Sequence, residues 1–174
     1  MKVITTPEIF EKSKRSEVCC FLAGGITNCR NWQNDVITEL KYETDNLILF
    51  NPRRENFPIH DSNAALEQIS WEFKWLENCD IFSIYFDGTN KSDQPICFYE
   101  LGRNIERMKI KFPVDWEKRI IISVDKNFKR ADDVIIQTKL ATSNKIKINV
   151  SNSSDELIQM HINRIKNAFK YLLL

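Results

Sequence analysis

The stretch "VCCFLAGG", residues 18–25, decides the fold of this chain. Five apolar residues run without a polar break into an alanine and two glycines. A short apolar run of this kind is typical of a strand buried on both faces, as the strands of a parallel sheet are. After it, Trp32, Val36 and Leu40 recur at four-residue spacing, which predicts one buried face of a helix.

The same alternation of strand and helix continues along the chain. Four more buried strands are expected, at 46–52, 80–86, 119–124 and 146–150. Further helices are expected at 64–77, 95–108, 130–142 and 154–172. Strands that alternate with helices predict an α/β doubly wound fold around a central parallel sheet of about five strands. We find no linker, repeat or low-complexity segment in the sequence, so residues 1–174 are expected to form a single domain.

Two of these helices have faces that bear on the later argument. In the helix at 64–77, four apolar residues share one side and are expected to be buried, namely Ala65, Ile69, Phe73 and Leu76. Trp71 and Trp75 lie on another face and are predicted to be packing residues. The helix that begins at Pro95 has a predicted buried stripe of Cys97, Leu101, Ile105 and Met108.

The overall charge excludes a general attraction to polyanions. Lysine and arginine total 25 against 24 aspartates and glutamates, which leaves a net charge of +1. No nucleic acid or membrane partner is therefore expected, and any preference for an anion must come from a local cluster.

The cysteines and histidines give no pattern typical of a metal site. Five cysteines include no CxxC pair, and the sequence holds only His60 and His161 as further ligands. We expect reduced core cysteines, no metal and no cofactor. The first residues lack the apolar core of a signal peptide, and no apolar run reaches membrane-spanning length, so a cytoplasmic protein is expected.

Ligands of an open parallel sheet bind outside the carboxyl ends of the strands. Ala23, Gly24 and Gly25 form the turn after the first expected strand, and Arg53 lies in the loop after the second. The glycine pair fits either a tight turn or close backbone approach to a ligand. Arg53, with Arg54, is either a bidentate anion ligand or a solvated loop residue.

Gln68 and Glu72 lie one helical turn apart, beside the expected apolar stripe of their helix. A polar pair at the margin of a buried face suits a cleft wall that hydrogen-bonds a planar heterocycle. The alternative is a boundary glutamate paired with Lys74 or another cation.

Glu100 sits among apolar residues about a turn and a half after Pro95, and Gly102 follows as a point of close packing. Such a carboxylate, near the positive end of the helix dipole, could stay ionised while shielded from water, as a nucleophile requires. The alternative is an ordinary solvated helix position. The local pattern does not separate the two.

Taken in order, several segments resemble the nucleoside 2-deoxyribosyltransferase family. They are "FLAGGI" (21–26), "LFNPRR" (49–54), "QISWEFKWLENCDIF" (68–82) and "ICFYELGRN" (96–104), and the resemblance spans about 18–150. It implies a flavodoxin-like sheet and cleavage of a nucleoside N-glycosidic bond. It implies that Glu100 is the nucleophile that attacks C1′ of the deoxyribose and that Glu72 faces the leaving base. Asp93, or a neighbour one residue away, would hold the sugar hydroxyls, and the turn at Ala23–Gly25 would lie beneath the sugar.

The resemblance also implies the partners and a set of competing functions. The expected function is transfer of a deoxyribosyl group from a 2′-deoxyribonucleoside to a free nucleobase by a protein that forms a homo-oligomer. One alternative is a deoxynucleoside 5′-monophosphate N-glycosidase, with Arg53, Arg54 or the glycine turn on the phosphate. Another is a nucleotide-binding or sensing module without turnover. The support for the last is Phe21, which stands where many family members have a tyrosine that touches the nucleophile; Tyr85 or Tyr99 is the expected substitute.

Overall fold

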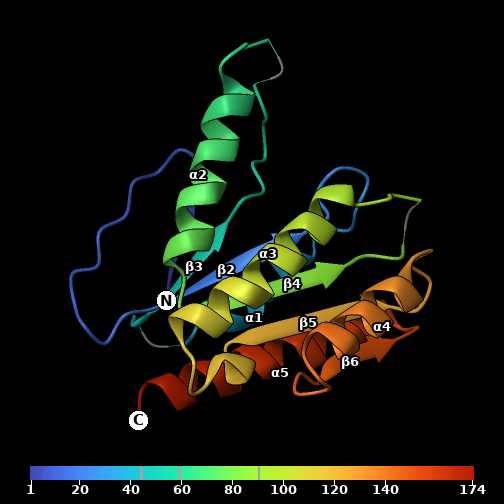
Figure 1. Cartoon of the computed structure of the whole chain (residues 1–174). Helices are drawn as coiled ribbons and strands as arrows, with labels where there is room; N and C mark the ends of the chain where they lie inside the picture. Colours follow the sequence, from blue (N-terminus) through green and yellow to red (C-terminus); the bar gives the residue numbers. More distant parts are fainter. Residues whose placement is uncertain (44, 59, 90) are drawn as a thin grey trace.

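The chain folds around one parallel sheet with helices on both faces (Figure 1). The computed structural model describes residues 1–43, 45–58, 60–89 and 91–174. Its strands are β1 (Lys2–Thr5), β2 (Val18–Gly24), β3 (Leu47–Asn51), β4 (Ile81–Phe86), β5 (Ile120–Asp125) and β6 (Ile148–Ser151). Its α-helices are α1 (Trp32–Leu40), α2 (Ala64–Asn78), α3 (Pro95–Lys111), α4 (Ala131–Ala141) and α5 (Ser154–Leu172). The predicted α/β doubly wound fold is confirmed.

The sheet has six strands in the described residues, one more than the sequence predicted. Their order is β1-β3-β2-β4-β5-β6, and all neighbours pair in parallel. The missed strand is β1, which pairs with β3 at the edge of the sheet. Only Ile4 of its four residues is buried. A short edge strand with one buried side chain has no continuous apolar run, so the pattern that identified the other strands is absent from it.

Two apolar cores lie on opposite faces of the sheet because side chains alternate along each strand. Phe21, Phe50 and Phe82 point to the face covered by α2, α3 and α4. Leu22 and Tyr85 point to the other face, which α1 and α5 cover. In Figure 1, α2 and α3 lie in front of the strands, and α5 runs behind them.

The predicted buried face of α3 is confirmed, whereas that of α2 is wrong except at Leu76, which is buried. Cys97, Leu101, Ile105 and Met108 of α3 are all buried. Trp71 and Trp75 of α2 are buried in the core, as predicted for packing residues, while Ile69 and Phe73 are 64% and 55% exposed. The Trp75 ring stacks on Phe50 with 4.2 Å between centroids. The sequence of α2 contains two apolar stripes, and its helical period does not show which of them is buried. The stripe with the two tryptophans packs on the sheet.

The course of the chain creates a crevice beside β2. From β2 the chain passes through α1 to β3 on one side, whereas from β4 it passes through α3 to β5 on the other. Neighbouring strands whose connections diverge leave a crevice outside their carboxyl ends. None of the described helices is long and apolar enough to cross a membrane.

Candidate active site

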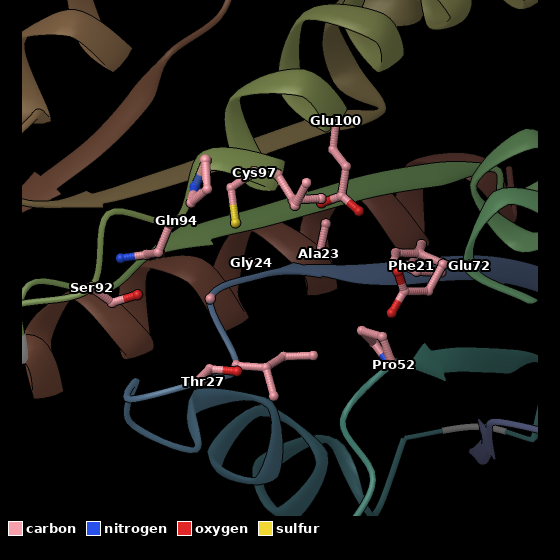
Figure 2. Close-up of a pocket in the computed structure, with 14 residues that line it drawn as sticks. Phe21, Ala23, Gly24, Thr27, Pro52, Glu72, Ser92, Gln94, Cys97 and Glu100 are labelled. Carbon is pink, nitrogen blue, oxygen red and sulfur yellow. The ribbon is translucent and has the colours of Figure 1, made fainter. Parts of the chain in front are cut away.

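A pocket of about 250 Å³ occupies this crevice. Its wall is formed by the end of β2 and the turn after it, by residues that follow β3 and precede α3, and by side chains of α2 and α3 (Figure 2). The lining residues are Phe21, Ala23, Gly24, Gly25, Ile26, Thr27, Pro52, Glu72, Ser92, Gln94, Pro95, Ile96, Cys97 and Glu100. The pocket therefore brings together segments that are up to 79 residues apart, from Phe21 to Glu100.

Two glutamates reach this pocket from different helices. Figure 2 shows Glu72 and Glu100 approaching the same space from α2 and α3. Glu100 is 9% exposed. Burial and the nearby carboxylate of Glu72 raise the pKa of Glu100 to about 8, and the charge of Arg103 opposes that rise. Burial also raises the pKa of Glu72, against a hydrogen bond from Gln68 and the charge of Arg54.

The raised pKa of Glu100 differs from the sequence expectation that the helix dipole would keep it ionised. Glu100 is the sixth residue of α3, beyond the first turn in which the dipole acts. Burial and a like charge then dominate. Two carboxyl groups that repel each other in one pocket titrate as a coupled pair, an arrangement that allows one to act as a base or nucleophile while the other acts as an acid.

The turn after β2 depends on both glycines. Gly24 has φ +143°, and a Cβ there would lie 2.4 Å from the backbone oxygen of Tyr85. A Cβ on Gly25 would lie 2.4 Å from Cys29 Sγ and 2.6 Å from Gln94 Oε1. The absence of side chains lets the turn approach β4 and the segment before α3, which places backbone in the pocket wall.

Gln94 closes the side of the pocket opposite Glu72 (Figure 2). Its backbone is left-handed, with φ 46° and ψ 48°. Its amide forms two hydrogen bonds with the backbone of Asp87: Nε2 donates to the carbonyl at 2.7 Å, and Oε1 accepts from the N–H at 3.2 Å. Sequence reasoning missed Gln94 because its role depends on this loop conformation.

The comparison with protein families agrees with the pocket. The family model described as nucleoside 2-deoxyribosyltransferase like matches residues 17–115, more than half of the chain. The chain belongs to this family. The match covers β2 through α3 and so contains every residue of the pocket wall. No curated protein matches the sequence. Membership in the nucleoside 2-deoxyribosyltransferase-like family supports a related glycosyl-transfer or N-glycosidase function on small nucleosides or nucleobases.

Five of the eight site residues expected from the sequence line this pocket, namely Ala23, Gly24, Gly25, Glu72 and Glu100. Arg53, Gln68 and Asp93 do not line it. Asp93 is exposed and forms an ion pair with Lys129. Its neighbours Ser92 and Gln94 line the pocket instead. Glu72 and Glu100 are the carboxylates among the described lining residues, so a hydroxyl and an amide occupy the place in which the family resemblance suggested an acid.

Arg53 supports the pocket from outside rather than lining it. Its Nε donates to Gln33 Oε1 at 3.1 Å. One terminal nitrogen lies within 3.0–3.4 Å of four backbone carbonyls, those of Gly25, Ile26, Cys29 and Arg30. Arg53 thus holds the loop between β2 and α1, a role that its sequence context does not reveal. Arg54 pairs with Glu67 at 2.6 Å, so both arginines have protein partners.

The environment of Glu100 lacks the expected tyrosine. Phe21 is fully buried in the pocket wall, with its ring 6.1 Å from that of Trp71. Tyr85 points to the opposite face of the sheet and stacks on Trp32, and Tyr99 is 66% exposed. Neither tyrosine substitutes at Glu100. Gly102 was expected to allow close packing there, but outside its own helical turn no atom of the described residues lies within 4 Å of the place that a Cβ would occupy, so that expectation is wrong.

The cysteine in the pocket wall and the two histidines lie in surroundings that do not suggest a catalytic role. Burial raises the pKa of Cys97, so its sulfur in the pocket wall is a neutral thiol. His161 is buried between Ser83 and Ser123, each 2.7 Å away, and burial lowers its pKa to about 3. His60 is exposed. The described residues contain no group of three or more potential metal ligands.

Proposed function

We propose that this protein cleaves the N-glycosidic bond of 2′-deoxyribonucleosides and transfers the deoxyribosyl group to another nucleobase. The observation that carries the proposal is the pair of glutamates in one pocket, with Glu100 nearly buried. Membership in the nucleoside 2-deoxyribosyltransferase-like family supports it independently.

In the first step, a carboxylate oxygen of Glu100 attacks C1′ of the deoxyribose. The bond between C1′ and the base nitrogen breaks, and its electron pair stays on the base. Glu72 donates its proton to the departing base, which leaves as a neutral molecule. The product is a glycosyl ester of Glu100, as in retaining glycosidases. The transition state resembles an oxocarbenium ion, which an adjacent carboxylate stabilises.

In the second step, a nitrogen of an incoming base attacks C1′ and gives its proton to Glu72. The ester bond breaks, and Glu100 regains its carboxylate. If water attacks instead, the product is free deoxyribose. A 2′-deoxy sugar is favoured because it lacks the electron-withdrawing hydroxyl that destabilises the cation.

The proton shared by the two carboxyl groups suits both steps. When Glu72 holds it, the like charge that raises the pKa of Glu100 disappears, and Glu100 ionises more readily. The developing positive charge of the sugar favours the same distribution. The form of the pocket that reacts is therefore the one in which Glu72 holds the proton and Glu100 is ionised.

The monophosphate alternative rested on Arg53, Arg54 or the glycine turn, and of these the turn lines the pocket. Both arginines bind protein groups and do not line the pocket, which supports the nucleoside as the substrate. The sensor alternative rested on Phe21, which leaves Glu100 without a tyrosine but does not remove either carboxyl group from the pocket.

One assay separates these functions. The protein is incubated with each deoxynucleoside and each deoxynucleoside monophosphate, with and without a second free base, and products are followed by chromatography. Base exchange on nucleosides supports the proposal, and loss of exchange in Glu100→Gln supports the assigned nucleophile. Base release without exchange identifies a hydrolase, and binding without product identifies a sensor; either result contradicts the proposed transfer.

A further inference from the structure

Gln68 was expected to hydrogen-bond the base, yet its amide is directed at protein groups. Its Nε2 donates to the backbone carbonyl of Pro52 at 2.7 Å and to Glu72 Oε1 at 2.6 Å. Gln68 does not line the pocket, whereas Pro52 and Glu72 do. Its side chain therefore joins two parts of the pocket wall, the segment after β3 and the middle of α2.

The orientation of this amide is fixed by chemistry. A proline carbonyl has no hydrogen to donate, so the group that faces it must be the NH₂ of Gln68. The same NH₂ then presents its second hydrogen to Glu72 Oε1. Gln68 Oε1 is buried without a partner among the described residues. The opposite orientation would be worse, because it would place that oxygen against two acceptors.

This arrangement determines where Glu72 can carry a proton. In a neutral carboxyl group the carbonyl oxygen is the better acceptor, and the other oxygen bears the hydrogen. Because Oε1 accepts from Gln68 Nε2, this hydrogen bond favours the hydrogen on Oε2. No hydrogen bond joins Oε2 to another described residue, and the side chain enters the pocket beside Phe21 and above Pro52 (Figure 2).

We propose that Gln68 is a positioning residue that keeps the proton of neutral Glu72 on Oε2, where it is available to the departing base. This inference rests on the proposed glycosyl transfer and assigns a role that residue type alone did not suggest. Without Gln68, the hydrogen would be free to occupy Oε1 and point at Pro52.

The titratable groups around Glu72 come from two segments. Glu100 of α3 lies in the same pocket, where Glu72 raises the pKa of Glu100, and the charge of Arg54, which follows β3, favours the anion of Glu72. Gln68 itself favours the anion through its hydrogen bond. Removal of the Gln68 donor should therefore raise the pKa of Glu72, whether or not any substrate is present.

The test compares Gln68→Met with the parent protein. Methionine has a similar length and apolar body but no N–H. We expect the pKa of Glu72, followed by ¹³C NMR of its carboxyl carbon, to rise. We expect kcat to fall about tenfold, a part of the roughly 100- to 10,000-fold that a positioned general acid contributes. KM should change less than about twofold, because Gln68 does not touch substrate.

Controls separate this role from simple loss of packing. Gln137→Met makes the same change at an exposed position of α4 and should leave the pKa of Glu72 and kcat unchanged. The Glu72 resonance is assigned from its absence in Glu72→Gln. Gln68→Ala serves as a second variant and should shift the pKa in the same direction.

Two results would overturn the inference. One is an unchanged pKa of Glu72 in both Gln68 variants. The other is a KM that rises severalfold with kcat unchanged, which would place Gln68 on the base. If the parent protein transfers no glycosyl group, the proposed function fails, but the titration still decides whether Gln68 controls the ionisation of Glu72.

Discussion

Replacement of Glu100 by glutamine should stabilise the fold at alkaline pH. In the native protein, burial and Glu72 raise the pKa of Glu100 from 4.5 to about 8. In the unfolded chain the group returns to its ordinary value, so between these pH values the native state holds a proton that the unfolded state releases. The free energy of unfolding therefore falls as pH rises from about 4.5 to about 8, and the full loss is present above pH 8.

The size of this effect follows from the two pKa values. At about 1.4 kcal/mol per pKa unit, the difference between 4.5 and about 8 corresponds to at most about 5 kcal/mol. The actual effect on the free energy of unfolding is smaller than this limit, because solvent reaches the pocket and because Glu100 titrates together with Glu72. We expect Glu100→Gln to raise the free energy of unfolding by about 2 kcal/mol at pH 8.5. This corresponds to about 4–8 °C in Tm for a chain of this length.

The assay is thermal and urea denaturation of both proteins at pH 4.5 and pH 8.5. At pH 4.5 the two should differ little, because Glu100 is then neutral in the native protein. Glu39→Gln, at an exposed position of α1, is the matched control and should show no pH-dependent gain. A Glu100→Gln protein that gains no stability between pH 4.5 and 8.5, relative to the parent, would refute the reasoning.

Three further predictions concern the turn, the supporting arginine and the proton of the pair. Gly24→Ala should lower Tm by several degrees in thermal melts, because its Cβ would meet a backbone carbonyl at a φ of +143°. Gly102→Ala lies at an open helix position and should raise Tm slightly. Equal changes of Tm in the two variants would contradict this account. Arg53→Ala should lower Tm and raise KM equally for nucleosides and monophosphates, because Arg53 holds a loop; a selective loss on monophosphates would place it on the phosphate instead. The value of kcat/KM should fall above about pH 8, because Glu72 and Glu100 have then lost the last proton of the pair. A plateau of kcat/KM that extends to pH 10 would exclude this pair as acid and nucleophile.

The sequence predicted the parts of the fold that depend on burial alone. β2, β3, β4 and β5 are apolar on both faces, so each has a continuous apolar run that identifies it. β1 lacks that signal because it lies at the sheet edge. In α2 the sequence contains two apolar stripes, and only contact with Phe50 shows that the tryptophans face the sheet.

The candidate site was predictable to a similar extent. Glu100 and the glycine turn follow from their positions on elements with a clear apolar pattern and from the family resemblance. Glu72 follows from the resemblance, because the period of α2 indicated the wrong buried face. The contacts of Gln94, Gln68 and Arg53 could not be predicted, because each binds at least one backbone carbonyl whose position depends on loop conformation. Loops have no sequence period, so which carbonyl lies within reach of a side chain is known only from the folded structure.

The central claim is that Glu100 forms a covalent bond to the sugar. Its most direct test is intact-protein and peptide mass spectrometry after incubation with a 2′-fluoro-substituted deoxynucleoside, whose electron-withdrawing fluorine slows breakdown of the glycosyl ester. We predict a mass increase of one glycosyl group on the peptide that contains Glu100, and no increase in Glu100→Gln. A label on another residue, or base release that continues undiminished in Glu100→Gln, would contradict the mechanism.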